Sequence, residues 1–175
     1  MVVRALHMSR LSSQFSGRRL ICNSASVMAL IIGMTSFPVQ SQALDNTALP
    51  SGGAIVAGEA SFDYGTANEL HVQQSTDRTV INWDSFNIGQ DSLTEFHQPS
   101  SSALAVNRIT GASIDPTQIL GSLKANGQIL VLDGNGVIFG ENSIIDVGSL
   151  IATTGKVDTQ KIMNGSAIEI TDIGD

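Results

Sequence analysis

The stretch from Ala103 to Thr154 most constrains the fold, because it alternates short apolar segments with Gly, Asn, Asp and Ser. Each segment is too short for a helix and close to the ~5 residues of a typical strand. The segments are Ala103–Val106, Ile129–Leu132, Val137–Phe139, Ile144–Val147 and Leu150–Ala152. Asn126-Gly127 and Asn135-Gly136 separate some of them, and such pairs readily adopt the positive φ of tight turns. The stretch therefore predicts strands joined by turns.

The rest of the chain follows the same pattern. Short strands are predicted at Ala54–Ala57, 70–73, Thr79–Trp83 and Leu93–Phe96, and a last one at Ile168–Ile170 after a turn at Asn164-Gly165. The segment Ile114–Leu123 fits either one helical turn, with Pro116 near its start, or a short strand at Gln118–Leu120. No window of about 11 residues has helical periodicity, so we predict an all-β domain.

The apolar run Ile129–Leu132 indicates which all-β architecture to expect. Four consecutive apolar residues are typical of strands that are buried on both faces of a parallel sheet. The connections are too short for helical crossovers, which favours a parallel β-helix whose coils stack on one another. At roughly 20 residues or more per coil, the region after residue 43 could form on the order of five or six coils.

Residues 1–43 have the layout of a secretory signal peptide, which leaves 44–175 as the domain. A basic segment with Arg4, Arg10, Arg18 and Arg19 precedes the apolar run Val27–Met34 and the small-x-small site Ser41-Gln42-Ala43. This order predicts export by the Sec machinery and a mature chain that starts at Leu44. The apolar run is well short of the ~20 residues that would cross a bilayer as a helix.

The region after the leader is strongly acidic. All sixteen acidic residues lie there with only five of the nine basic residues, so its net charge is −11. A surface with this charge repels nucleic acid, which we therefore do not expect as a partner. The only cysteine, Cys22, lies in the leader. An exported domain without cysteine has to be held together by its core and its backbone pairing.

Five short blocks follow one another between about Leu49 and Val157. They are Trp83-x-x-Phe86-x-Ile88, Asn107-Arg108-Ile109-Thr110-Gly111, Ile119-Leu120-Gly121, Ala125-Asn126-Gly127 and Asn135-Gly136-Val137-x-Phe139-Gly140. In this order and spacing they resemble the amino-terminal domain of two-partner secretion exoproteins. That family comprises the filamentous-haemagglutinin-type adhesins and haemolysins of Gram-negative bacteria.

The resemblance implies a right-handed parallel β-helix whose amino end is capped by the early strands. It also implies a secretion signal, recognised by the periplasmic domains of a partner outer-membrane transporter, and no cofactor. After translocation the domain would template the folding of a longer passenger, and any host-cell or glycan target would belong to that passenger. Strand addition suits such recognition, because it reads an extended chain mainly through backbone hydrogen bonds.

The resemblance also selects candidate functional residues at two places. We expect Asn107, Arg108, Asn135 and Gly136 to serve secretion through corner geometry and partner contact. The family often has Asn-Pro-Asn-Gly where this chain has Asp133-Gly134-Asn135-Gly136, so the corner lacks the fixed φ of proline. Family domains also continue further and precede long passengers, which makes this chain, by expectation, a fragment, a truncated product or one piece of a longer protein.

A secreted β-helical carbohydrate-active enzyme is the alternative function. Its catalytic groups would come from Asp133, Glu141 and Asp146, with His97 or Arg108 assisting, and would need paired carboxylates in a cleft. We favour the interpretation that these acids are solvated turn residues and that the domain is not an enzyme. Two histidines and no cysteine after the leader do not predict a zinc site. A surface adhesin that binds its target directly is the third possibility.

Overall fold

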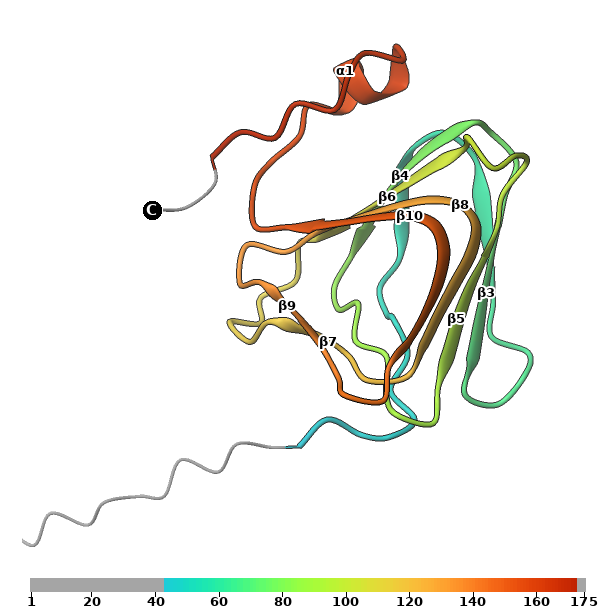
Figure 1. Cartoon of the computed structure of the whole chain (residues 1–175), viewed down its shortest axis with the longest axis vertical. Coiled ribbons are helices and arrows are strands. Elements are labelled where there is room, and N and C mark those ends of the chain that lie inside the picture. The colour runs from blue at the N-terminus through green and yellow to red at the C-terminus, as the bar shows by residue number, and fades with distance from the viewer. Residues whose placement is uncertain (1–42, 173–175) are drawn as a thin grey trace, which may run out of the picture. The chain divides into compact units, whose positions relative to one another are not determined.

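The structure is a computed structural model that describes residues 43–172, and Figure 1 shows them wound into stacked coils. Its strands are β1 (Ala54–Ala57), β2 (Ala60–Asp63), β3 (Glu69–Gln74), β4 (Arg78–Trp83), β5 (Leu93–His97), β6 (Leu104–Ile109), β7 (Thr117–Ile119), β8 (Ser122–Leu132), β9 (Val137–Phe139) and β10 (Ile144–Thr153). One short helix, α1 (Thr159–Met163), follows them. Among the described residues, no helix is long and apolar enough to cross a membrane.

The coils form a parallel β-helix, which confirms the expected architecture. On one side β3, β5 and the first halves of β8 and β10 pair in parallel, and on the next side β4, β6 and the second halves of β8 and β10 do so. On the third side β7 pairs with β9. Glu69, Leu93, Ser122 and Ile144 are in register on successive coils.

The helix has about four coils, so the expectation of five or six is wrong. One reason is that the first two strands form a cap instead of a coil. β1 pairs antiparallel with β4, and β2 pairs antiparallel with β3. Phe62 of β2 lies against Trp83 of the core, with ring centroids 5.1 Å apart. Antiparallel strands at this end cover the first coil, as the family resemblance implied.

The sheet formed by β4, β6 and the second half of β8 is buried on both faces, which explains the apolar run in β8. Ile129 and Val131 lie in the cluster inside the coils, while Leu130 and Leu132 lie in a second cluster on the outer face. Val157 and Ile162 of the segment that contains α1 cover this outer cluster. Side chains alternate across a strand, so burial of both faces requires an apolar residue at every position.

The α1 segment contains two differences from the sequence predictions. Asp158 caps the helix by accepting hydrogen bonds from the backbone of Gln160 and Lys161, but five residues are too few to show a helical period. The strand expected at Ile168–Ile170 is wrong, because only an isolated bridge between Lys156 and Thr171 forms there. Ile168 and Ile170 instead pack against the outer cluster. Their alternation therefore reflects a one-sided contact and not a sheet.

The glycine-containing breaks behave in two ways. Gly136 and Gly165 have φ of +99° and +77°, which confirms turns at Asn135-Gly136 and Asn164-Gly165. Asn126-Gly127 is not a tight turn, since it lies within β8 where the strand passes from one side of the helix to the next. The apolar segments Ile144–Val147 and Leu150–Ala152 likewise belong to one bent strand, β10, whose register shifts between them.

Asn126 explains how β8 turns without interrupting the pairing of the coils. Its Oδ1 accepts a hydrogen bond from the backbone N–H of Gln98 at 2.7 Å, and its Nδ2 donates to the carbonyl oxygen of Gln98 at 2.8 Å. The amide side chain thus takes the place of a backbone unit at the corner.

For the ambiguous segment Ile114–Leu123, the structure contains a strand, β7, and no helical turn.

Candidate functional site

The corner between β8 and β9, Asp133–Gly136, contains four of the candidate residues. The Asp133 side chain is buried, and its Oδ2 accepts hydrogen bonds from Thr117 N at 2.9 Å and Thr117 Oγ1 at 2.6 Å. Its Oδ1 accepts from Asn135 N at 2.9 Å. A buried carboxylate with three donors is well satisfied. Asp133 therefore fixes this corner onto the preceding coil.

The other three residues of the corner have separate roles. Asn135 Nδ2 donates to the carbonyl oxygen of Ser113 at 2.8 Å, a second link to the preceding coil. Gly136 has φ of +99°, a value that favours glycine, and its N–H donates to Asp133 O at 2.9 Å. Gly134 is exposed at the tip, and a Cβ added there would meet no atom within 4 Å. The corner is thus rigid at its base and open at Gly134.

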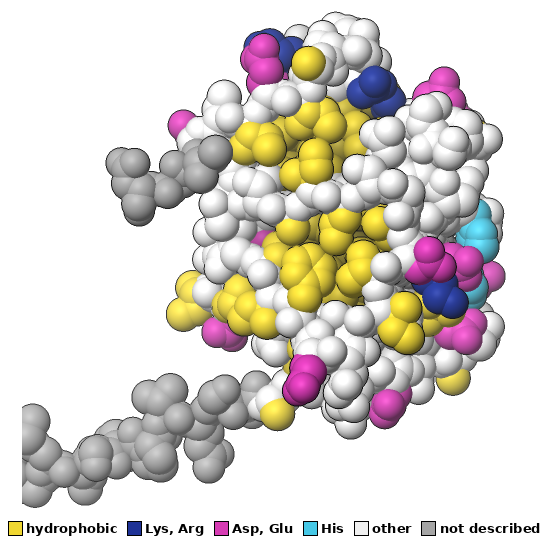
Figure 2. All heavy atoms as spheres, viewed as in Figure 1, with side chains coloured by type: hydrophobic (Ala, Val, Ile, Leu, Met, Phe, Trp, Pro, Cys, Tyr) yellow, Lys and Arg dark blue, Asp and Glu magenta, His cyan; other side chains and the backbone are white. Residues whose placement is uncertain are grey.

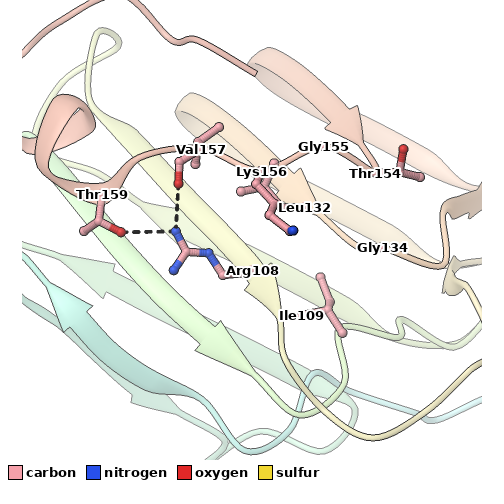
Figure 3. Close-up of a pocket in the computed structure, with 9 residues that line it drawn as sticks. All are labelled: Arg108, Ile109, Leu132, Gly134, Thr154, Gly155, Lys156, Val157 and Thr159. Atoms are coloured by element: carbon pink, nitrogen blue, oxygen red, sulfur yellow. Dashed lines mark hydrogen bonds between the residues drawn. The ribbon is translucent and has the colours of Figure 1, made fainter. Parts of the chain in front are cut away.

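Asn107 and Arg108 are neighbours on β6 but lie on opposite faces of the sheet. Asn107 is fully buried inside the coils, where its Oδ1 accepts a hydrogen bond from Trp83 Nε1 at 2.9 Å. Arg108 lies on the outer face, and its Nη2 donates to Val157 O at 3.4 Å and to Thr159 Oγ1 at 3.1 Å (Figure 3). Arg108 therefore holds the segment before α1 against the sheet.

Arg108 and Gly134 line a common cavity of about 470 Å³, shown in Figure 3. The remaining lining residues are Ile109, Leu132, Thr154, Gly155, Lys156, Val157 and Thr159. The structure thus brings two candidate residues together here, while Asn107 lies in the core. The lining contains two cationic side chains but no carboxylate, thiol or imidazole. It offers no acid–base pair.

The carboxyl end of the β-helix carries an apolar surface that the sequence patterns did not identify. Within residues 43–172, β10 pairs only with β8. Ile145 is in register with Leu123 of the core, yet it is 36% exposed because no coil lies above it. Phe139, Ile144 and Ile151 are exposed beside it. Figure 2 shows apolar side chains gathered at the centre of the visible face.

The three acids of the alternative enzyme site belong to different elements. Asp133 follows β8, Glu141 follows β9 and Asp146 lies within β10. In the described part of the chain, the only His, Cys, Asp or Glu side chains that gather within 4.8 Å as a group of three are His71, Glu95 and His97. Asp133, Glu141 and Asp146 do not form such a group of three.

Comparison with known proteins gives one family and several relatives. The family model of the TPS secretion domain matches residues 39–174. A heme/hemopexin-binding protein of Haemophilus influenzae is 42% identical over 106 residues, which cover 61% of this chain and 11% of that protein. A second protein of that name from the same species is 37% identical over 111 residues, which cover 63% of this chain and 12% of the second protein.

A solved structure supports the same likeness. The secretion domain of HMW1 from Haemophilus influenzae is 28% identical and superimposes with a TM-score of 0.64, over 72% of this chain and 33% of that one. The chain spans about a tenth of the length of the curated relatives that it matches. The likeness thus concerns the secretion region and not those proteins as a whole.

Proposed function

Because this chain belongs to the family of two-partner secretion (TPS) domains, we propose that its β-helix is the part of a longer exoprotein that a partner outer-membrane transporter recognises through its periplasmic domains. The chain is a secretion domain, and proteins that carry it pass through the periplasm to the cell surface or the medium. The predicted signal peptide, residues 1–43, would deliver it to the periplasm through the Sec machinery. Nearly all of that leader lies outside the described residues.

The observation that carries this proposal is the open end at β10. Its inward-facing side chains Ile145 and Val147 continue the stack that Leu123 and Ala125 form one coil earlier. Another coil would cover these side chains and pair with the free edge of β10. A passenger emerging from the transporter could therefore fold coil by coil on this end. Each added coil would bury apolar surface and draw more chain outward.

We propose that the transporter binds the chain before it folds. Asn107 is fully buried in the β-helix, and Asp133 is nearly so. These side chains are accessible to a partner only in an extended chain. Strand addition is the mode that suits such a chain, with backbone hydrogen bonds for affinity and pockets for side-chain selection. In the folded state the same residues stabilise the coils.

Binding of a host molecule is proposed for the passenger and not for this domain. The two curated relatives are named for binding heme and hemopexin, but they are about nine times longer than the matched region. We also propose that the domain is not an enzyme, since its family is defined by secretion. The buried carboxylate of Asp133 supports that view, since it accepts three hydrogen bonds within its own corner.

A binding measurement with the periplasmic domains of the cognate transporter tests the recognition step. The chain is added to the immobilised domains either folded or directly after dilution from urea. We expect the freshly diluted chain to bind, and the folded chain to bind about 10-fold more weakly or worse, because Asn107 and Asp133 are then buried. Failure of both states to bind would contradict the proposed recognition.

A further inference from the structure

Four polar side chains form a cluster on the outer face of β3 and β5, away from the corner and the open end. In the register of these parallel strands, His71 lies beside Glu95, and Gln73 lies beside His97. Glu69, His71, Glu95 and His97 all face outward, because Leu70, Val72 and Phe96 between them lie in the core. Figure 2 shows histidine side chains next to acidic ones at the edge of the molecule.

Three atoms of this cluster face one another. His71 Nδ1 lies 3.2 Å from His97 Nε2 and 3.5 Å from Glu95 Oε2, and His97 Nε2 lies 3.8 Å from Glu95 Oε2. The fourth side chain lies behind His71, since Glu69 Oε2 is 3.1 Å from His71 Nε2. The centroids of the His71 and His97 rings are 5.4 Å apart, and the ring planes are inclined by 18°.

The contact with Glu69 determines which nitrogen of His71 has a free lone pair. An ionised carboxylate only accepts hydrogen bonds, so His71 Nε2 carries the hydrogen and donates to Glu69. The neutral ring then presents the lone pair of Nδ1 to His97 and Glu95. If His97 carries its hydrogen on Nε2, this N–H donates to His71 Nδ1. If His97 carries it on Nδ1, three acceptor atoms face one point and repel one another unless a proton or a cation lies between them.

The dimensions of this triangle fit a metal ion. Zinc binds imidazole nitrogen and carboxylate oxygen at about 2.0–2.2 Å, so the edge of its coordination tetrahedron is roughly 3.3–3.6 Å. The three separations, 3.2, 3.5 and 3.8 Å, lie within a few tenths of an ångström of this edge. We propose that His71 Nδ1, His97 Nε2 and a Glu95 oxygen bind a divalent transition metal such as Zn²⁺, with water as the fourth ligand.

Two further residues adjust this site. Glu69 holds the His71 ring through its outer nitrogen, the arrangement in which a carboxylate orients a metal-bound imidazole. Lys124 on the next coil is in register with Glu95, and its positive charge opposes a bound cation. The cluster is half-buried, with 24% of the His71 side chain and 42% of the His97 side chain exposed. An ion can thus enter without opening of the core.

The site belongs to the folded domain only. His71 and His97 are 26 positions apart in sequence and lie on successive coils, so stacking of these coils brings them together. A metal that binds here ties the first coil to the second and stabilises the folded state over the extended chain.

Zinc binding by the full chain without an affinity tag tests this inference. Isothermal titration and competition with a chromogenic chelator should give one Zn²⁺ per chain. We expect His71→Gln or His97→Gln to weaken binding by about 100-fold or more, and Glu69→Gln to weaken it about 10-fold. Lys124→Gln should tighten it. His7→Gln, which removes the third histidine, and Glu59→Gln, which removes an exposed acid, should leave it unchanged.

The melting temperature of each variant shows whether a loss of Zn²⁺ binding comes from misfolding. Without metal, His97→Gln should melt within a few degrees of the unsubstituted chain, because the ring lies outside the core. With excess Zn²⁺, only chains with the intact cluster should gain several degrees in melting temperature. The proposal is overturned if the unsubstituted chain binds no Zn²⁺, or if it binds Zn²⁺ equally well after His71→Gln and His97→Gln. In the first case a proton shared by the two rings suffices to explain the cluster.

Discussion

Trp83 Nε1 donates a hydrogen bond to Asn107 Oδ1 at 2.9 Å, and both side chains are fully buried between adjacent coils. The indole is a donor only, so it needs one acceptor wherever it is buried. Asn107 supplies this acceptor from the next coil of the stack. The pair thus links the block that begins at Trp83 to the block that begins at Asn107. Its direct role in the folded chain is structural.

Asn107→Ala should lower the free energy of unfolding by about 2–3 kcal/mol, because it leaves the indole N–H buried and unpaired. Asn82→Ala is a matched control, since the Oδ1 atom of Asn82 makes no hydrogen bond in the described structure. It should cost less than about 1 kcal/mol. Urea unfolding followed by Trp83 fluorescence compares the two. Equal losses in both variants would contradict a structural role for the pair.

Asp133→Asn should destabilise the corner by about 2–3 kcal/mol, because an amide cannot accept from all three donors of Thr117 and Asn135. Asp146→Asn is the control, since Asp146 is exposed on β10 and should change stability by no more than about 0.5 kcal/mol. Thermal unfolding measures the stability of the Asp133→Asn and Asp146→Asn variants. A stable Asp133→Asn variant would show that the corner does not depend on the carboxylate.

Gly134→Pro should raise stability by about 0.4–1 kcal/mol by restricting the unfolded chain. Gly134 is not among the glycines with positive φ, and its position leaves space for a side chain. Gly136→Pro should cost about 3 kcal/mol or more, because its φ is +99° and its N–H donates to Asp133 O. Chemical denaturation measures the free energy of unfolding of the Gly134→Pro and Gly136→Pro variants. Destabilisation by Gly134→Pro would mean that the corner of this chain cannot adopt the family's Asn-Pro-Asn-Gly form.

Ile162→Ala should destabilise the domain by about 2–4 kcal/mol, because this α1 side chain is only 2% exposed over the outer cluster. Ile138→Ala removes the same atoms from a side chain that is 49% exposed and should cost about 0.5 kcal/mol or less. The stabilities of the two variants, Ile162→Ala and Ile138→Ala, are compared by their denaturant midpoints. Similar midpoints would show that α1 does not contribute to the outer core.

The sequence predicted the strands of this fold better than the corners between them. The run Ile129–Leu132 identified a strand buried on both faces, since such burial imposes an apolar residue at each position. The tight turn predicted at Asn126-Gly127 is wrong. The side chain of Asn126 replaces backbone pairing at a corner of the β-helix, and the backbone there does not adopt a positive φ. Only the three-dimensional position of Gln98 shows this.

The candidate site was predicted in part, for a similar reason. The turn at Gly136 follows from residue type, but the burial of Asp133 depends on Thr117, which lies one coil away. The opposite directions of Asn107 and Arg108 follow from strand alternation once the interior face is known. The cluster of His71 and His97 depends on the register between β3 and β5 on successive coils. A local sequence pattern does not predict which residues of two distant strands pair.

Export by a partner transporter tests the central claim most directly. The full chain is expressed in a Gram-negative host with or without the cognate transporter, and the medium is assayed for a product that begins near Leu44. A transporter that lacks its periplasmic domains serves as the control. We predict release only with the intact transporter. Retention in the periplasm despite an active transporter, both for this chain and for a version extended by passenger sequence, would contradict its assignment as the export signal.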